Sequence, residues 1–364
     1  MMSKRIAVVG AGVIGLSVAW RLARAGHPVT VVDPAPGTGA SWVAGGMLAP
    51  VAEAGPGEEG LLEIGSASLE CWPAFADRLR AEAADPGLRT EGTLVAALDA
   101  TDAAELDTLA DHLSGLGRPV RRLSGRELRA LEPGVGPGVR SGLLVPGDLA
   151  VDNRELLRAL RKAARDRKVE FIAAAASAVR GGAVVLTDGS IVDCSTAVVA
   201  AGAWSGALHP ALAGLVRPVK GEILRLRARP GALPPPRHTI RAVVESRPVY
   251  LVPRSGGELV LGATQYEAGF DTEVTVRGVR DLLEGAERIL PGIGEYALTE
   301  CAAGLRAGSR DNLPLIGEVE PGVLVATGHH RNGLLLAPIT ADAVLALVEG
   351  GTHPAARFRT EGTT

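Results

Sequence analysis

The segment near the N-terminus has residue types that can hold the phosphates of a dinucleotide. Gly10-Ala11-Gly12-Val13-Ile14-Gly15 follows the apolar run 6–9, and residues 13–25 then have helical apolar spacing. The glycines allow a tight turn and a close approach of the backbone to a pyrophosphate, and the start of a helix offers unpaired N–H groups. Asp33 ends the next apolar run, close to the spacing of about 20 residues expected for an acid that binds a ribose hydroxyl. The segment therefore predicts binding of NAD or FAD, and the acid argues against NADP, whose 2′-phosphate it would repel.

The segment that follows Asp33 favours FAD over NAD. Residues 39–50 read GASWVAGGMLAP, a run of small residues directly after the second apolar run. Such a loop can place backbone N–H groups along a pyrophosphate and a flat ring. The alternative is a flexible linker, but Trp42, Met47 and Leu48 are not typical linker residues.

Two arginines and a tyrosine could recognise a small acid. Arg306 lies in a glycine-flanked run, 304–308, and an arginine can hold a carboxylate with two parallel hydrogen bonds. Tyr250 begins an apolar run, and Arg331 precedes a helix expected at about residues 334–348. The start of that helix, aimed at a flavin, would stabilise the negative charge that reduction produces. The alternatives are a surface arginine in a glycine turn, a cross-strand aromatic residue and a solvated loop arginine.

No other reactive group stands out. His329 and His330 have no cysteine or acidic cluster nearby at metal-ligand spacing, so we expect no metal. No general base is evident either. Hydride transfer from the α-carbon of a neutral amine to a flavin needs none, because the cofactor carries that step.

These residues need a scaffold in which strands and helices alternate. Strands followed by helices recur at the start, middle and end of the chain, whereas residues 86–145 and 221–299 are typical of antiparallel strands with helices. The sequence therefore predicts an α/β protein with a Rossmann-like domain of discontinuous segments, threaded through an antiparallel-sheet domain of α+β type. Residues 61–84 are expected to form a helix that Pro73 kinks or starts, and Asp152 is expected to cap another helix.

The composition excludes several classes of protein. The chain has 364 residues, of which 46% are hydrophobic and 22% charged, which excludes a disordered or coiled-coil chain. The net charge is −3 and no basic run occurs, which argues against nucleic acid as a partner. No segment approaches the about 18 apolar residues of a membrane span, so no membrane association is expected. The 3 cysteines are far apart in sequence, which predicts no disulfide framework and favours a reducing, cytoplasmic location.

Four segments together resemble the glycine-oxidase branch of the D-amino-acid-oxidase-like family of FAD-dependent oxidoreductases. They are residues 39–50, 304–308, 311–317 (DNLPLIG) and 328–333 (GHHRNG), and they occur in order across essentially the whole chain. The resemblance implies an FAD-binding domain made of residues 1–85, 146–220 and 300–364. It implies a substrate-binding domain made of residues 86–145 and 221–299, and FAD that is held non-covalently.

The resemblance also implies roles for particular residues. Arg306 matches the family's carboxylate-binding arginine, Tyr250 its active-site tyrosine, and Arg331 the arginine of a loop that meets substrate and flavin; these are the predicted catalytic and substrate-binding residues. Two positions depart from the family: His330 replaces a usually aromatic residue, and Gln265, predicted near the substrate, replaces a frequent methionine. The predicted cofactor-binding residues are Gly10, Gly12, Val13, Ile14, Gly15, Asp33, Pro34, Ala40, Ser41, Gly45, Gly46, Met47, Gly202, His329, His330, Arg331, Asn332, Gly333, Leu334 and Leu335.

The activity that the resemblance implies is oxidative deamination of glycine and similar small amino acids, such as sarcosine and small D-amino acids. The products would be an imine or the α-keto acid, ammonia and hydrogen peroxide, with oxygen as the electron acceptor and glycine imine feeding the thiazole of thiamine. A homo-oligomer such as a tetramer is implied as well. Two alternatives stay open. One is a D-amino-acid or sarcosine oxidase or dehydrogenase of the same family, and the other is a redox-silent dinucleotide-binding module.

Overall fold

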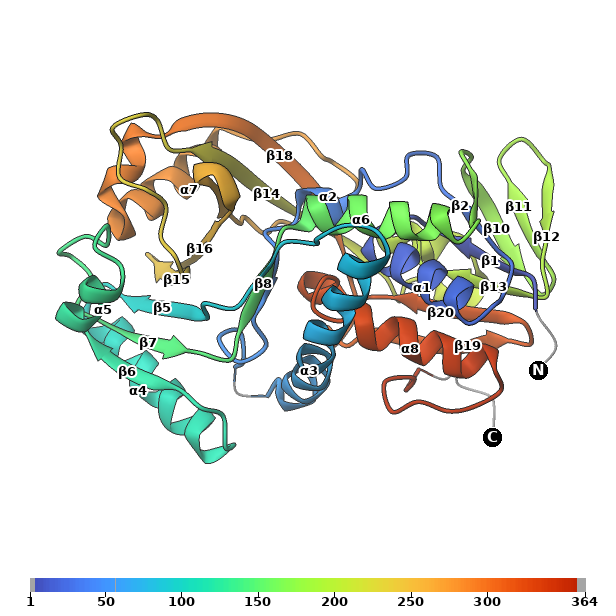
Figure 1. Cartoon of the computed structure of the whole chain (residues 1–364), viewed down its shortest axis with the longest axis horizontal. Coiled ribbons are helices and arrows are strands. Elements are labelled where there is room, and N and C mark those ends of the chain that lie inside the picture. The colour runs from blue at the N-terminus through green and yellow to red at the C-terminus, as the bar shows by residue number, and fades with distance from the viewer. Residues whose placement is uncertain (1–3, 56, 359–364) are drawn as a thin grey trace.

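A six-stranded sheet forms one half of the molecule in the computed structural model, which describes residues 4–55 and 57–358 (Figure 1). The strand order is β19-β20-β13-β1-β2-β9, and all neighbours are parallel except β19 and β20. The strands are β1 (Ile6–Val9), β2 (Val29–Val32), β9 (Glu170–Ile172), β13 (Thr196–Val199), β19 (Leu315–Glu320) and β20 (Val323–Thr327). The first, middle and last parts of the chain all contribute strands, as predicted for the Rossmann-like part.

This sheet is covered on both faces, which explains why β1 reads as an uninterrupted apolar run. Ile6 and Val8 belong to a core with helices α1 (Val13–Arg24), α3 (Glu59–Glu82), α6 (Asn153–Asp166) and α8 (Ala337–Val348). Ala7 and Val9, which alternate with them, face a core with a second, three-stranded antiparallel sheet. That sheet consists of β10 (Ala176–Arg180), β11 (Ala183–Leu186) and β12 (Ile191–Asp193).

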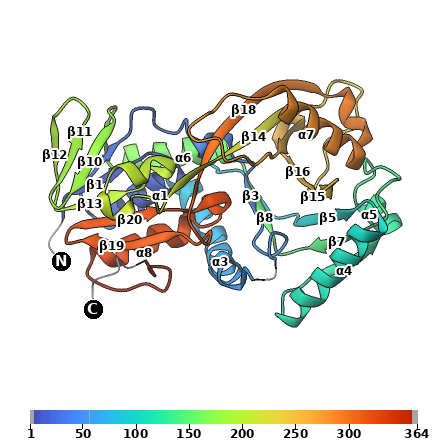
Figure 2. The ribbon, with the colours of Figure 1, turned by 180° about the vertical axis from the view of Figure 1, so that it is seen from behind.

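An eight-stranded sheet forms the other half, with the order β18-β14-β17-β16-β15-β5-β7-β6. It is antiparallel except for the pair β15 and β5, which is parallel. Helix α7 (Val276–Ile289) packs on it through Leu282, Ala286 and Ile289. The view from behind shows this helix beside β14 and β16 (Figure 2). The helices α4 (Ala100–Gly115) and α5 (Gly125–Leu131) lie at the far end of the sheet. The strands are β5 (Thr93–Ala97), β6 (Arg121–Ser124), β7 (Ser141–Val145), β14 (Arg217–Arg227), β15 (Thr239–Val244), β16 (Arg247–Pro253), β17 (Glu258–Gly262) and β18 (Ala297–Gly308).

Short elements lie where the two halves meet. The helix α2 (Ala40–Val43) contacts β18, and a small sheet joins β3 (Met47–Leu48), β8 (Leu149–Val151) and β4 (Leu88–Arg89). The remaining turns are the 3₁₀ segments η1 (Gly202–Ala207), η2 (Pro210–Leu212), η3 (Ser255–Gly257), η4 (Pro291–Glu295) and η5 (His330–Asn332). The predicted domain borders at residues 220/221 and 299/300 fall inside β14 and β18, and the division into domains stays a prediction.

The ends of two helices differ from the predictions. Helix α3 begins at Glu59 and continues through Pro73, so Pro73 does not start it. Buried Trp72 and Phe75 on either side of the proline pack into the core, which compensates for the backbone hydrogen bond that the proline lacks. Helix α8 begins at Ala337 rather than near residue 334, because η5 precedes it and Pro338 occupies its first turn, where proline is tolerated.

The predicted cap of α6 is confirmed. The Asp152 carboxylate accepts hydrogen bonds from the backbone N–H groups of Arg154 and Glu155. The strands β16 and β17 form an antiparallel pair, as is typical of the pattern in residues 221–299. Within the described residues, every helix is too short or too polar to cross a membrane.

Candidate active site

The first cavity lies at the carboxyl ends of the parallel strands β1 and β2, beside the start of α1. This is the edge at which open α/β sheets bind their ligands. Its volume is about 490 Å³, and besides the predicted residues it is lined by Trp204, Leu208 and Leu305. The predicted cofactor-binding residues that line it are Gly10, Gly12, Val13, Ile14, Asp33, Pro34, Ala40, Ser41 and Gly202.

The turn at the start of this cavity can be made only by glycines. Gly10 has a φ of +107°, and a Cβ added to it would lie 2.3 Å from the carbonyl oxygen of Ala200. A Cβ on Gly15 would lie 1.9 Å from the carbonyl oxygen of Gly10, so Gly15 supports the turn from beneath without lining the cavity. The first N–H groups of α1 lack partners inside the helix, and Gly12 has no side chain to cap them. The Val13 N–H donates to the Ser41 hydroxyl at 3.0 Å. This arrangement fits the pyrophosphate of a dinucleotide.

Asp33 closes the same turn. Its Oδ2 accepts a hydrogen bond of 2.6 Å from the Ala11 N–H, and its Oδ1 accepts one of 2.8 Å from the Ala35 N–H. Each carboxylate oxygen has a second lone pair, so the acid can still accept a hydrogen bond from a ribose hydroxyl. The cavity therefore offers both of the groups that the sequence predicts for a dinucleotide, and it fits FAD.

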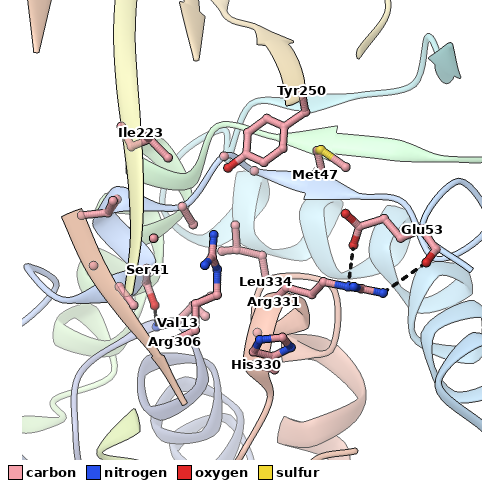
Figure 3. Close-up of a pocket in the computed structure, with 18 residues that line it drawn as sticks. Val13, Ser41, Met47, Glu53, Ile223, Tyr250, Arg306, His330, Arg331 and Leu334 are labelled. Carbon is pink, nitrogen blue, oxygen red and sulfur yellow. Dashed lines mark hydrogen bonds and ion pairs between the residues drawn. The ribbon is translucent and has the colours of Figure 1, made fainter. Parts of the chain in front are cut away.

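The second cavity, of about 130 Å³, lies between the two large sheets and shares Val13, Ala40 and Ser41 with the first (Figure 3). It brings together side chains from three elements that are separate in sequence, β16, β18 and η5. The predicted site residues that line it are Gly45, Gly46, Met47, Tyr250, Arg306, His330, Arg331, Gly333 and Leu334.

Arg306 projects from β18 into this second cavity without a carboxylate partner. Its Nη1 donates to the carbonyl oxygen of Thr264 at 3.2 Å and to that of Lys220 at 3.5 Å. Burial lowers the pKa of its guanidinium, which still stays protonated because arginine starts so high. Among residues 4–55 and 57–358 no acid forms an ion pair with it. A Cβ on Gly221 of β14 would lie within 2.5 Å of the guanidinium carbon, so that glycine makes the room for Arg306.

Tyr250 faces the same cavity from β16. A Cβ on Gly45 or on Gly262 would lie about 2.5 Å from its ring, so two glycines from opposite sides enclose the aromatic side chain. Burial raises the pKa of the phenol, which is therefore protonated at neutral pH. In the described part of the chain the hydroxyl makes no hydrogen bond, and it can donate one into the cavity.

The guanidinium of Arg331 is turned toward two acids. Its Nε lies 3.4 Å from Glu53 Oε2 (Figure 3). Its Nη2 lies 3.0 Å from Glu58 Oε2. Nη2 also donates to the backbone carbonyl oxygen of Glu53 at 3.1 Å. The side chain lines the cavity, but two carboxylates already balance its charge. A direct contact of Arg331 with substrate stays a prediction.

The two histidines of the GHHRNG segment differ in position. The His330 ring lines the second cavity, and burial lowers its pKa to about 4, so the ring is neutral. The His329 ring is buried away from the cavity, with Nε2 3.0 Å from the Thr340 hydroxyl, and burial lowers its pKa to about 3. Asn332 and Leu335 line a smaller neighbouring hollow beside Glu58.

Gln265 is not where the sequence analysis places it. Its side chain is exposed and lines neither cavity. The reason is that β17 ends at Gly262 and the chain leaves the sheet, after which Tyr266 pairs with Lys220. Ile223 of β14 lines the cavity instead, together with Met47.

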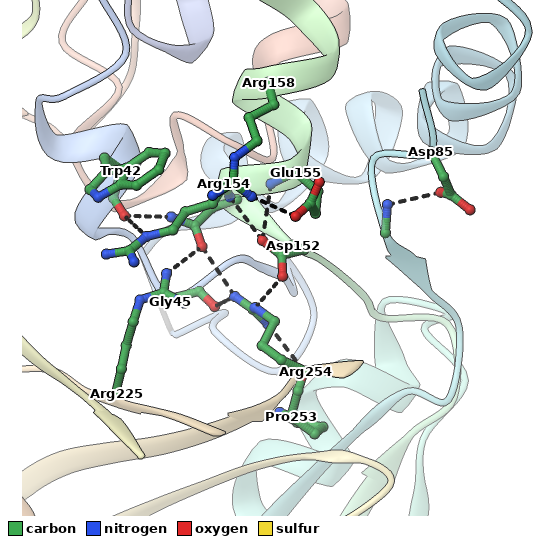
Figure 4. A network of polar contacts seen from close by, with 12 residues as sticks. Trp42, Gly45, Asp85, Asp152, Arg154, Glu155, Arg158, Arg225, Pro253 and Arg254 are labelled. Atoms are coloured by element: carbon green, nitrogen blue, oxygen red, sulfur yellow. Dashed lines mark hydrogen bonds and ion pairs between the residues drawn. The ribbon is translucent and has the colours of Figure 1, made fainter. Parts of the chain in front are cut away.

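A buried polar cluster holds the loop that carries Gly45, and the sequence analysis missed it (Figure 4). The Asn153 side-chain amide, at the start of α6, donates to the carbonyl oxygens of Ser41 and Trp42 at 2.9 and 2.8 Å. The Asn153 Oδ1 accepts from Arg225 at 3.0 Å, and Arg254 donates to the carbonyl oxygen of Gly45 at 2.6 Å. The cluster joins both halves of the molecule at the loop predicted to contact the flavin.

Glu53 was missed as well. It is the single acidic residue among those that line the second cavity, within the part of the chain that the structure describes. Its position, just beyond the GASWVAGGMLAP segment, is the signal in the sequence that points to it.

The glycine turn and Asp33 at the end of the next strand can hold a dinucleotide cofactor. The adjoining cavity contains the Arg306 guanidinium, which has no acidic partner within the described residues and can hold a small acid. These two features together are typical of an oxidoreductase. Residues 5–347 match the model of the FAD dependent oxidoreductase family, and the chain belongs to this family.

Three proteins that are similar to this chain over nearly its full length indicate its place within the family. A glycine oxidase of Geobacillus kaustophilus is 34% identical over 94% of this chain and 92% of the relative, and a crystal structure of glycine oxidase from that organism matches all of both chains with a TM-score of 0.90. A putative thiamine biosynthesis oxidoreductase ThiO of Rhizobium etli is 36% identical over 93% of this chain and 95% of the relative. The structure of an iminodiacetate oxidase from Chelativorans sp. BNC1 matches 96% of each chain with a TM-score of 0.86 and 26% identity.

Proposed function

We propose that this chain is an FAD-dependent oxidase that deaminates glycine and other small amino acids, such as sarcosine and small D-amino acids. For glycine the balanced reaction converts glycine, oxygen and water into glyoxylate, ammonia and hydrogen peroxide. The observation that carries the proposal is the guanidinium of Arg306, which is half-buried, has no acid as a partner in the described residues, and faces a cavity next to the dinucleotide cradle. Partial desolvation of an unpaired cation has a cost, which the carboxylate of a ligand would offset.

Different residues bind the cofactor and the substrate. Gly10, Gly12 and the start of α1 hold the pyrophosphate, and Asp33 holds the ribose. When bound, FAD would supply the two-electron redox chemistry, with oxygen as the final electron acceptor. Arg306 fixes the substrate carboxylate with two hydrogen bonds, which orients the α-carbon.

Tyr250 and the apolar side chains complete the pocket. The protonated phenol of Tyr250 donates a further hydrogen bond to the substrate. Met47, Ile223 and Leu334 keep water from the reacting carbon. None of the cysteines lines either cavity, which supports FAD held without a thioether link.

The experiment measures cofactor and products together. Acid precipitation of the purified yellow protein should release FAD into the supernatant. Peroxide formation should be highest with glycine or sarcosine in a panel that adds N-ethylglycine, D-alanine, D-proline and L-amino acids. A colourless protein, or peroxide only with L-amino acids, would contradict the proposal.

The biological role and assembly extend the same proposal. The Rhizobium etli relative is named a putative thiamine biosynthesis oxidoreductase, which supports a role for glycine imine in making the thiazole of thiamine.

We expect the protein to be a cytoplasmic homo-oligomer such as a tetramer. Light scattering coupled to size-exclusion chromatography would measure its oligomeric state. A monomer at micromolar concentration would contradict that part.

A further inference from the structure

Glu53 places a negative charge in the cavity that holds Arg306. Its side chain is 16% exposed, and its carboxylate is the one acidic group on the wall of this cavity within residues 4–55 and 57–358. Glu53 and Arg306 are near enough for the carboxylate to favour the charged form of the guanidinium. The substrate pocket therefore contains one free cation and one anion.

The loop that carries Glu53 is fixed by hydrogen bonds to its backbone. The buried Asp148 carboxylate accepts from the N–H groups of Val51 and Ala52 at 3.3 and 3.1 Å. Arg241 donates to the carbonyl oxygen of Ala52 at 2.6 Å. These bonds fix the backbone directly before Glu53, and so they fix the point from which its side chain reaches the cavity.

The positive charges of the two arginines near Glu53, Arg241 and Arg331, are already balanced by glutamates. Arg331 pairs with Glu53 and Glu58, and Arg241 pairs with Glu53 at 3.6 Å. These two arginines and two glutamates sum to a formal charge of zero. A ligand carboxylate at this end of the cavity would meet the Glu53 carboxylate without an unpaired cation to offset the repulsion. Arg306 can bind one carboxylate, and the geometry offers no second position.

We propose that Glu53 is a specificity-determining residue that excludes substrates with a second carboxylate, so that the enzyme accepts small amines with one carboxylate. The inference rests on the proposed function, since it takes Arg306 as the anchor of the first carboxylate. Repulsion by a like charge discriminates between ligands without any added attraction for the preferred one. Iminodiacetate, D-aspartate and similar dicarboxylates would be poor substrates for this reason.

The test uses two acids that cannot be oxidised, acetate and malonate, and the FAD-loaded enzyme. Each acid is titrated while the visible absorbance of the flavin reports binding. The wild-type enzyme should bind acetate at least about tenfold more tightly than malonate. Glu53→Gln keeps the shape and removes the charge, and the ratio of the two Kd values should fall by at least about tenfold. The kcat/KM ratio for glycine over iminodiacetate should fall in the same direction.

Two further variants separate charge from structure. Glu63→Gln is the control for loss of one negative charge, because Glu63 pairs with Arg357 and lies outside this cavity and outside the group of Glu53, Glu58, Arg241 and Arg331; it should change the Kd ratio by less than about threefold. Glu53→Asp retains the charge and should retain the discrimination, which keeps the test valid if Glu53→Gln lowers stability.

The outcomes distinguish the two proposals. An unchanged acetate-to-malonate ratio in a Glu53→Gln enzyme that oxidises glycine would overturn the role of Glu53 alone. A ratio that falls as expected in a protein whose wild-type form does not oxidise glycine would support Glu53 and overturn the proposed function. A wild-type enzyme that binds malonate as tightly as acetate would also overturn the role of Glu53.

Discussion

Replacement of Arg306 by alanine should remove most of the transition-state binding of amino-acid substrates. The guanidinium lies in a water-poor cavity, with two carbonyl oxygens as its hydrogen-bond acceptors within the described residues, at 3.2 and 3.5 Å. Two charge-assisted hydrogen bonds to a substrate carboxylate contribute about 1.5–3 kcal/mol each. The loss of about 3–6 kcal/mol corresponds to a fall of roughly 10²–10⁴-fold in kcat/KM for glycine.

The assay is peroxide formation at varied glycine concentration, with FAD content and melting temperature measured in parallel. Arg306→Lys should be intermediate, because a point charge keeps the attraction and loses the bidentate geometry. Gly221→Ala should also lower kcat/KM, since its Cβ would displace the guanidinium while leaving the charge in place. A carboxylate-free amine such as ethylamine should be almost insensitive to all three changes. A loss below about tenfold for Arg306→Ala on glycine, or an equal loss on ethylamine, would refute the assignment.

Three other changes test separate parts of the structure. Asp33→Ala should weaken FAD binding by about tenfold to a hundredfold, because it removes a charge-assisted hydrogen bond to the ribose and two hydrogen bonds to the backbone. The assay is the rise in flavin fluorescence on dilution of the enzyme. Unchanged affinity would show that Asp33 does not hold the ribose. Asn153→Ala should lower both FAD affinity and the free energy of unfolding by about 2–4 kcal/mol, because the carbonyl oxygens of Ser41 and Trp42 each lose the hydrogen bond from the Asn153 amide. Lys162→Ala on the exposed side of α6 should change neither by more than about 0.5 kcal/mol. Burial raises the pKa of Asp148 to about 7, so the folded state binds a proton that the unfolded state releases near pH 4.

The third change is Asp148→Asn, and the bound proton determines how its effect on the free energy of unfolding depends on pH. Its contribution to stability is fully present below about pH 4 and is lost as the pH rises to about 7, by roughly 4 kcal/mol in all. Asp148→Asn cannot titrate, so the advantage of the wild type over the variant in urea unfolding should shrink between about pH 5 and pH 8. A difference that stays constant or grows over this range would show that Asp148 is not protonated in the folded state.

The dinucleotide-binding part could be predicted because its signals are local. The spacing of Gly10, Gly12 and Gly15 between an apolar run and a helix specifies the turn directly, and the φ of Gly10 shows why another residue would not serve. The family resemblance then supplied Arg306 and Tyr250, which the structure places on one cavity although they come from different strands. Neither the glycine spacing nor the strand pattern alone would have joined them.

The parts that were missed depend on contacts between distant segments. The position of Glu53 follows from Asp148, nearly one hundred residues further along the chain, which holds the backbone of its loop. The direction of the Arg331 guanidinium follows from Glu53 and Glu58, and no local pattern around Arg331 indicates these partners. The cluster of Asn153, Arg225 and Arg254 likewise joins three elements. Such placements are determined by tertiary packing, which residue spacing does not encode.

Anaerobic mixing with glycine tests the central claim most directly. The purified enzyme, loaded with FAD, is mixed with glycine in the absence of oxygen while the visible absorbance of the flavin is followed. The account predicts that glycine bleaches this absorbance, and that later admission of oxygen restores it with release of hydrogen peroxide and glyoxylate in equal amounts. Absorbance that persists at saturating glycine, or recovery in oxygen without peroxide, would contradict the account.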